Sequence, residues 1–89
     1  MKEARPYKEI REDSSRIREF DQNISEDELV WHRDGEDRII VAEEFTDWLI
    51  QFDNELPQSL NEEVFIPKGV YHRIIKGSGN VTLKVVKMS

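Results

Sequence analysis

The strongest structural signal in this sequence is the run Phe65-Ile66-Pro67-Lys68-Gly69-Val70-Tyr71-His72. Its apolar first residues suit a strand, and Pro67 ends that strand because proline has no N–H to give to a sheet. Gly69 permits a tight turn or a positive φ. His72 then lies at the start of a second apolar strand, where its imidazole can face the interior. The run predicts two strands joined by a tight turn.

Short strand-like segments continue on both sides of this turn. They are rich in β-branched and aromatic residues and cover residues 16–20, 29–32, 38–41, 48–52, 64–66, 70–75 and 81–86. Turn-forming clusters at residues 53–55 and 77–80 separate some of them. Such spacing, without long helical segments, indicates an all-β sandwich or barrel. Residues 16–89 are therefore expected to form one domain, preceded by a charged arm or a short helix over residues 1–15 that begins near Pro6.

The bulk properties narrow the possible functions. A chain of 89 residues forms one domain, and a homodimer would let so small a domain bury more apolar surface. The absence of cysteine excludes disulfides, thiolate metal sites and a thiol nucleophile. The sequence shows no apolar run long enough for a membrane span and no stretch like a signal peptide, so we expect a cytoplasmic protein that does not bind membranes.

Charge is distributed unevenly along the chain. The formal net charge is −6, and fifteen of the nineteen acidic residues fall within residues 19–63. Residues 64–89 carry five basic residues and no acidic ones. An acidic middle repels a phosphate backbone, and no basic stripe with interleaved aromatics is present. We therefore expect no nucleic-acid partner.

The segment from Asn61 to His72 resembles the second conserved motif of the cupins. That motif runs glycine, five residues, proline, one residue, glycine, two residues, histidine. Pro67, Gly69 and His72 match it, and Asn61 stands at the first glycine, where asparagine is tolerable because it also visits left-handed conformations. The resemblance implies a cupin-type double-stranded β-helix, the jelly-roll barrel, over about residues 29–86.

The first cupin motif is only partly matched. It usually runs histidine, one residue, histidine, three or four residues, glutamate, six residues, glycine. If His32 is the second histidine, Asp37 falls at the glutamate. If His32 is the first histidine, Asp34 replaces the second, and the glutamate position falls on Arg38 or nearby.

The two histidines of the chain both fall on motif positions. With one carboxylate, His32 and His72 would form a two-histidine, one-carboxylate site suited to a divalent ion such as Fe, Mn, Ni or Zn. The four-residue alignment favours Asp37 as the third ligand, with Asp34 and Glu36 as alternatives. In another interpretation, His72 hydrogen-bonds a buried carboxyl and holds no metal.

Three residues near the histidines are candidates for contact with a small-molecule ligand, namely Asp34, Arg38 and Tyr71. Arg38 suits a ligand carboxylate, although an ion pair with a neighbouring acidic residue is equally compatible. Tyr71 has a polar tip, but it adjoins His72 and would face the opposite side of a flat strand.

These observations leave three functional hypotheses. The first is a cupin-type barrel that binds a small molecule, with or without a divalent metal. The second is a metal-dependent enzyme of the dioxygenase or isomerase type, as the resemblance allows. The third is a non-catalytic structural or interaction protein. The fold alone cannot select among them, because one architecture hosts unrelated functions.

Overall fold

A computed structural model describes residues 8–11, 15–25 and 29–88. These residues form strands and connecting loops, which confirms the expected all-β class. The strands are β1 (Lys8–Arg11), β2 (Ser15–Phe20), β3 (Asp37–Ala42), β4 (Leu49–Phe52), β5 (Gln58–Ser59), β6 (Val64–Ile66), β7 (His72–Ile75) and β8 (Val81–Met88). No helix that could cross a membrane occurs in the described ranges.

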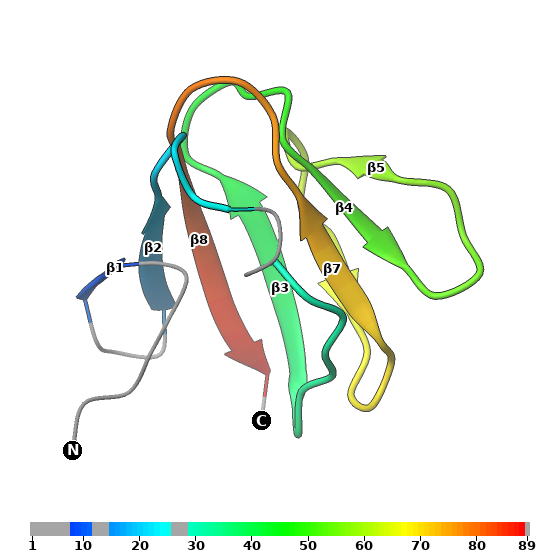
Figure 1. The fold of residues 1–89 in the computed structure, drawn as a ribbon. Coiled ribbons are helices and arrows are strands. Elements are labelled where there is room, and N and C mark those ends of the chain that lie inside the picture. The colour runs from blue at the N-terminus through cyan, green and yellow to red at the C-terminus, as the bar shows by residue number, and fades with distance from the viewer. Residues whose placement is uncertain (1–7, 12–14, 26–28, 89) are drawn as a thin grey trace, which may run out of the picture.

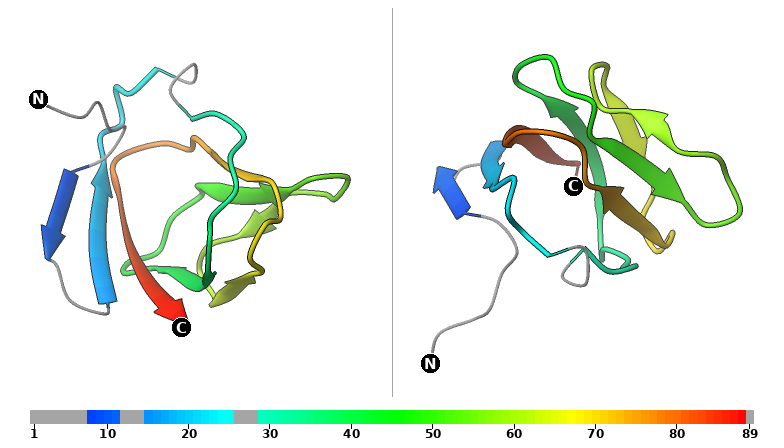
Figure 2. Two further views of the ribbon diagram at one scale, coloured as in Figure 1. Left: turned by 90° about the horizontal axis from the view of Figure 1, so that it is seen from below. Right: turned by 45° about the horizontal axis from the view of Figure 1, so that its top comes forward.

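The strands build two antiparallel sheets. One sheet has five strands in the order β1-β2-β8-β3-β6, and the other has three in the order β5-β4-β7. Figure 1 shows the larger sheet on the left and the smaller one on the right, and the views in Figure 2 show the two facing each other across the interior. Two antiparallel sheets that face each other in this way bury one core between them.

Buried and more exposed side chains alternate along the strands, and this alternation separates the core from the surface. In β8, Val81, Leu83 and Val85 are buried and the residues between them are less so. The same period of two recurs in β4 and β6, as expected for sheets that bury one face. The buried apolar residues form one cluster, made of Phe20, Ile40, Trp48, Ile50, Phe52, Leu60, Val64, Ile66, Val81, Leu83 and Val85.

The structure differs from the predicted elements in three places. Residues 8–11 form an edge strand paired with β2, and not the helix offered as an alternative for the arm; residues 1–7 lie outside the described residues. Residues 29–32 do not form a strand but a loop with one isolated bridge at His32. Strand β5 was not predicted, because its Gln58 and Ser59 are polar and exposed and carry no apolar alternation.

The turn between β6 and β7 forms as its sequence predicts, but Asn61 acts differently from the glycine it replaces. Gly69 has a φ of 80°, whereas Asn61 is not among the described residues with a positive φ. The Asn61 amide instead pairs with the backbone of Thr46, accepting from its N–H and donating to its carbonyl, both at 2.9 Å. Asn61 therefore does not use the left-handed conformation that makes asparagine tolerable at this position, and its side chain ties two loops together.

Candidate metal centre

The residues 29–34 that precede β3 form a strap across the beginning of β7. The strap and β7 meet at a single bridge, in which the N–H of His32 donates to the carbonyl of His72 at 2.9 Å and the N–H of His72 donates back at 2.8 Å. Residues directly opposite in such a pair place their side chains on the same face. The bridge therefore brings two histidines, forty residues apart in sequence, into one place.

The residues on either side of the bridge face the opposite way and make two cation–π contacts. The guanidinium of Arg73 lies 4.9 Å from the ring centre of Trp31, and that of Arg33 lies 5.3 Å from the ring centre of Tyr71. Each contact joins the strap to β7 or to the residue preceding it. Contacts of this kind at exposed sites contribute about 0.5–1 kcal/mol. Together with the bridge, they hold the strap against the barrel.

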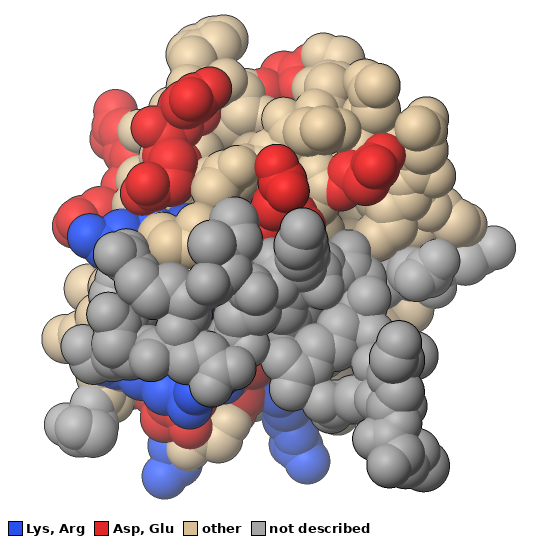
Figure 3. Space-filling model, turned by 90° about the vertical axis from the view of Figure 1, so that its left-hand side faces the viewer, with Lys and Arg blue, Asp and Glu red and all other residues tan. Residues whose placement is uncertain are grey.

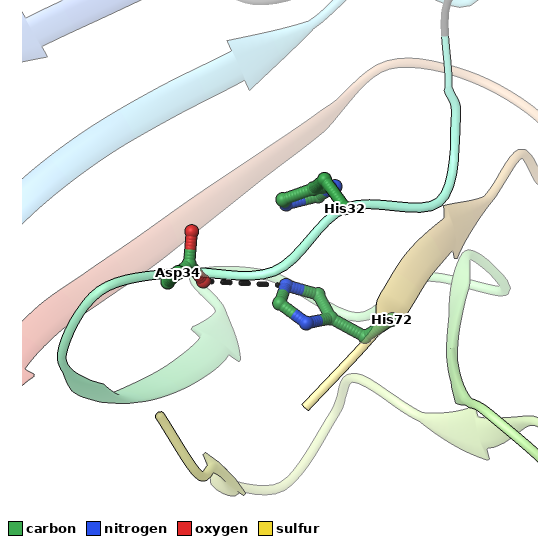
Figure 4. A group of neighbouring side chains, drawn as sticks. All are labelled: His32, Asp34 and His72. Atoms are coloured by element: carbon green, nitrogen blue, oxygen red, sulfur yellow. Dashed lines mark ion pairs between the residues drawn. The ribbon is translucent and has the colours of Figure 1, made fainter. Parts of the chain in front are cut away.

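On the inner face, three side chains converge, and we call them the histidine–carboxylate group: His32, Asp34 and His72. Their metal-ligating atoms all lie within 4.8 Å of one another. The two imidazole centroids are 4.3 Å apart, and Nε2 of His72 lies 3.4 Å from Oδ2 of Asp34. Figure 4 shows the two rings and the carboxylate turned toward a common region, with Asp34 and His32 on the strap and His72 on β7.

Hydrogen bonds set the tautomer of both imidazoles. Nδ1 of His72 lies 3.0 Å from the carbonyl oxygen of Val70, and Nδ1 of His32 lies 3.1 Å from that of Val30. A carbonyl oxygen only accepts, so each Nδ1 carries the proton and each neutral ring has its lone pair on Nε2. This is the outer hydrogen bond that metal-ligating histidines commonly make.

His72 is the buried member of the group, with 3% of its surface exposed. Burial lowers the pKa of His72, and the neighbouring His32 and Arg38 act in the same direction, whereas the Val70 carbonyl and Asp34 oppose them. Phe52, opposite His72 on β4, adds an apolar wall with its ring centre 6.1 Å away. The neutral imidazole is thus the favoured form, as metal ligation requires.

Arg38 holds the carboxylate of Asp34 in place. One terminal nitrogen of its guanidinium lies 3.3 Å from Oδ1 of Asp34, while the other lies 2.6 Å from Oε2 of Glu36. Nε of Arg38 also donates to Glu36 at 3.0 Å. With Oδ1 directed at Arg38, the other oxygen of Asp34 is left facing His72. Arg38 therefore makes the ion pairs that one of the two sequence interpretations expected.

The turn of residues 67–69 fixes the strap relative to β7. The N–H of Gly69 donates to the carbonyl of Asp34 at 3.0 Å, and the N–H of Lys68 donates to Oδ1 of Asp37 at 2.7 Å. The proline–glycine turn thus positions both the histidine that follows it and the loop that carries the carboxylate.

The candidate residues divide into those that the fold brings together and those that it does not. Asp37, favoured as third ligand from spacing, lies outside the histidine–carboxylate group and caps the turn. Glu36 is engaged by Arg38, and Tyr71 faces away from His72 with 44% of its surface exposed. The arrangement matches the alignment in which His32 is the first motif histidine and Asp34 replaces the second.

Sequence reasoning did not find the roles of Trp31, Arg33 and Arg73. Their positions follow from the register of the bridge. Because His32 is opposite His72, residue 31 is opposite residue 73, and residue 33 is opposite residue 71. The isolated bridge that sets this register has no sequence pattern of its own.

Neither a protein-family model nor a curated protein matches the sequence, whereas solved structures match the fold. A cupin-2 domain containing protein from Shewanella frigidimarina NCIMB 400 aligns with a TM-score of 0.59 at 20% identity, over 99% of this chain and 85% of its own. A chain from the crystal structures of the DMSP lyases RdDddP and RnDddQII aligns with a TM-score of 0.68 at 12% identity.

The structure of FeII HppE aligns with a TM-score of 0.63 at 11% identity, over 83% of this chain. The present chain spans 41% of HppE and 37% of the DMSP lyase chain. At these identities the likeness concerns the fold. It confirms the expected fold: the chain folds as a small cupin-type barrel.

Proposed function

We propose that this cupin-type domain binds a small molecule beside a divalent metal ion held by His32, Asp34 and His72. The proposal keeps the two histidines expected from the sequence and takes Asp34 as the carboxylate. A structure of similar fold is that of FeII HppE, an iron(II) form, and the proposal extends a divalent ion to this chain.

One observation carries the proposal: two acceptors face each other at the centre of the group. Nε2 of a neutral His72 and Oδ2 of Asp34 are 3.4 Å apart, and neither has a proton to give to the other. Two acceptors at this distance, one buried and the other only 11% exposed, repel unless a cation or a proton lies between them. Ligands at about 2.0–2.2 Å from one ion are roughly 3–3.5 Å apart, so the separation suits two ligands of the same metal.

The remaining residues support the three ligands. His32 is the exposed member of the three. Arg38 holds Oδ1 of Asp34, and the Val70 and Val30 carbonyls hold the two imidazoles. A bound ion of this type polarises oxygen groups of a ligand. The described chain would contribute binding, orientation and an apolar wall at Phe52.

The small ligand set also favours a second candidate, a metal-dependent enzyme. Catalytic metals commonly have three protein ligands and keep positions open for water and substrate, whereas structural zinc is closed by four. Two histidines and one carboxylate are the set typical of non-haem Fe(II) oxygenases. Exchangeable positions can be tested by adding azide to the cobalt(II)-loaded protein, since its visible spectrum changes when azide enters the ion's coordination sphere.

The proposal is tested by elemental analysis of protein purified without chelator or nickel resin, followed by calorimetric titration of the metal-free protein with Zn²⁺. We expect wild-type protein to bind a single ion per chain. The variants His72→Ala and Asp34→Ala should bind it about tenfold or more weakly, because each removes a ligand.

Asp37→Ala is the matched control, since Asp37 is an acidic residue three positions away that caps the neighbouring turn. It should retain zinc binding. Protein that carries no metal and gains none on incubation would exclude the proposed ion. Loss of binding in Asp37→Ala with retention in Asp34→Ala would instead restore the ligand set favoured by sequence spacing.

A further inference from the structure

Glu36 has a place in the structure other than the one its spacing offers. The sequence makes it an alternative third ligand, whereas it lies outside the histidine–carboxylate group. It immediately precedes β3 and contacts Arg38, the second residue of that strand. Arg38 in turn contacts Asp34. Glu36 is thus connected to one proposed ligand through a single side chain.

The guanidinium of Arg38 is shared unequally between the two carboxylates. Its Nε and one terminal nitrogen donate to Oε2 of Glu36, at 3.0 Å and 2.6 Å. The other terminal nitrogen lies 3.3 Å from Oδ1 of Asp34. Because the guanidinium is planar and its donors form a rigid fork, the two hydrogen bonds to Glu36 fix its orientation. Glu36 therefore determines how Arg38 approaches Asp34.

Burial strengthens the contact between Arg38 and Asp34. The side chains of Arg38 and Asp34 are 16% and 11% exposed, and that of Glu36 is 34% exposed. Fully exposed ion pairs contribute little because water and salt screen them, whereas partly buried pairs are screened less. The position of the Arg38 guanidinium is therefore felt at the Asp34 carboxylate.

The two oxygens of Asp34 have different partners, and this difference depends on how Arg38 is held. Oδ1 faces Arg38, and Oδ2 faces Nε2 of His72. A guanidinium that is free to turn can pair with both oxygens of one carboxylate through two parallel hydrogen bonds. Such a pair would engage Oδ2, which the proposed ion requires. Glu36 opposes it by occupying two of the nitrogens of Arg38.

Positive charge near Arg38 acts in the same direction. Lys87 is opposite Arg38 in the register of β3 and β8. Figure 3 shows Lys and Arg atoms mainly in the lower part of the molecule, where β3 begins and β8 finishes in Figure 1, and acidic atoms over much of the upper part. A cation that approaches Asp34 is repelled by the charge of Arg38, and the carboxylate of Glu36 offsets that charge.

We infer that Glu36 is a positioning residue that holds Arg38 away from Oδ2 of Asp34 and thereby raises the metal affinity of the histidine–carboxylate group. Glu36 supplies no ligand atom and acts through Arg38. The effect on affinity rests on the proposed function. The effect on the Asp34 carboxylate is present in metal-free protein and is measured there separately.

The first test is calorimetric titration of Glu36→Gln with Zn²⁺. We expect it to bind zinc about tenfold more weakly than wild type, at the lower end of the loss typical for outer partners of metal ligands. Asp37→Asn is the matched control, because it removes a negative charge from the next residue and keeps an oxygen that accepts from the N–H of Lys68. It should bind zinc as wild type does. Equal losses in the two variants would show an effect of net charge alone and would overturn the inference, as would unchanged affinity in Glu36→Gln.

The second test uses metal-free protein and the carbon-13 chemical shift of the Asp34 carboxyl group, which changes with the hydrogen bonds that this group accepts. We expect Glu36→Gln to change the shift, Asp37→Asn to leave it unchanged, and Glu36→Gln to have no further effect in an Arg38→Met background. An equal change with and without Arg38, or no change in Glu36→Gln, would contradict a role through Arg38. If wild-type protein binds no zinc while the shift behaves as expected, the positioning role of Glu36 stands and the proposed metal function fails.

Discussion

At the residue scale, His72 couples the charge state of the site to the stability of the fold. Its pKa is lowered chiefly by burial, so the unfolded chain, with an ordinary histidine pKa of about 6.5, takes up the proton first as the pH falls. Stability is therefore fully present above pH 6.5 and declines as the pH drops toward the lower pKa of the folded state. We expect urea denaturation of metal-free protein to show this decline.

His72→Gln isolates that contribution, because glutamine does not titrate. Relative to wild type, the variant should lose less stability between neutral and mildly acidic pH. His32, Asp34 and Arg38 lie close enough to influence the titration, so the comparison is between the two pH profiles and not between single values. Parallel profiles would show that His72 is not the group responsible.

Residue contacts also explain why the structure groups Asp34 with the histidines, although spacing along the sequence favoured Asp37. Counting four residues from His32 reaches Asp37, but its carboxylate caps Lys68 and lies outside the histidine–carboxylate group. Asp34 joins the histidines because the strap turns it inward and Arg38 holds its far oxygen. Those determinants are contacts between segments, whereas the motif is a count along one segment.

At the element scale, the strap is the part of the structure that assembles the site. It pairs with β7 at one bridge, and the two outward cation–π contacts add to that bridge and to the hydrogen bond from Gly69 to Asp34. Trp31→Ala removes one of these cation–π contacts, a loss of about 0.5–1 kcal/mol. We expect amide hydrogen exchange at His32, whose N–H donates to His72, to become roughly two- to fivefold faster.

Phe45→Ala is the matched control, since Phe45 is an aromatic residue that is 91% exposed on the loop between β3 and β4. Its removal should leave exchange at His32 unchanged. Equal acceleration in both variants would indicate a general loss of stability and would contradict a local role for Trp31. An unchanged rate in Trp31→Ala would show that the backbone bridge alone suffices.

Elements differed in how well the sequence predicted them. Strands β3, β4, β6, β7 and β8 follow from apolar alternation between turn signals, because each buries one face in the core. The proline–glycine turn followed from backbone chemistry at Pro67 and Gly69. The conformation of the strap could not be predicted in this way. It depends on contacts with β7, with Arg38 and with the turn, and not on a repeat within residues 29–34.

At the scale of the whole molecule, the proposed ion would join the two sheets. His72 belongs to the three-stranded sheet, while the strap with His32 and Asp34 leads directly into β3 of the five-stranded sheet. Unfolding separates these ligands, so an ion that binds only the folded chain stabilises it by mass action. At a free ion concentration of about one hundred times the Kd, the gain is about 2.7 kcal/mol.

For a domain of this size, each kcal/mol raises Tm by roughly 4–8 °C, which predicts a rise of about 10–20 °C in thermal unfolding with Zn²⁺. At the same zinc concentration the rise should fall to about half or less in Asp34→Ala, the loss expected for binding that is tenfold or more weaker. It should persist in full in Asp37→Ala, because only Asp34→Ala loses a ligand. Hydrogen exchange measured separately in β7 and in β3 tests whether the ion stabilises both sheets. A metal that joins the sheets must slow exchange in both strands, whereas protection confined to β7 would mean that the ion binds one sheet and leaves the other unlinked.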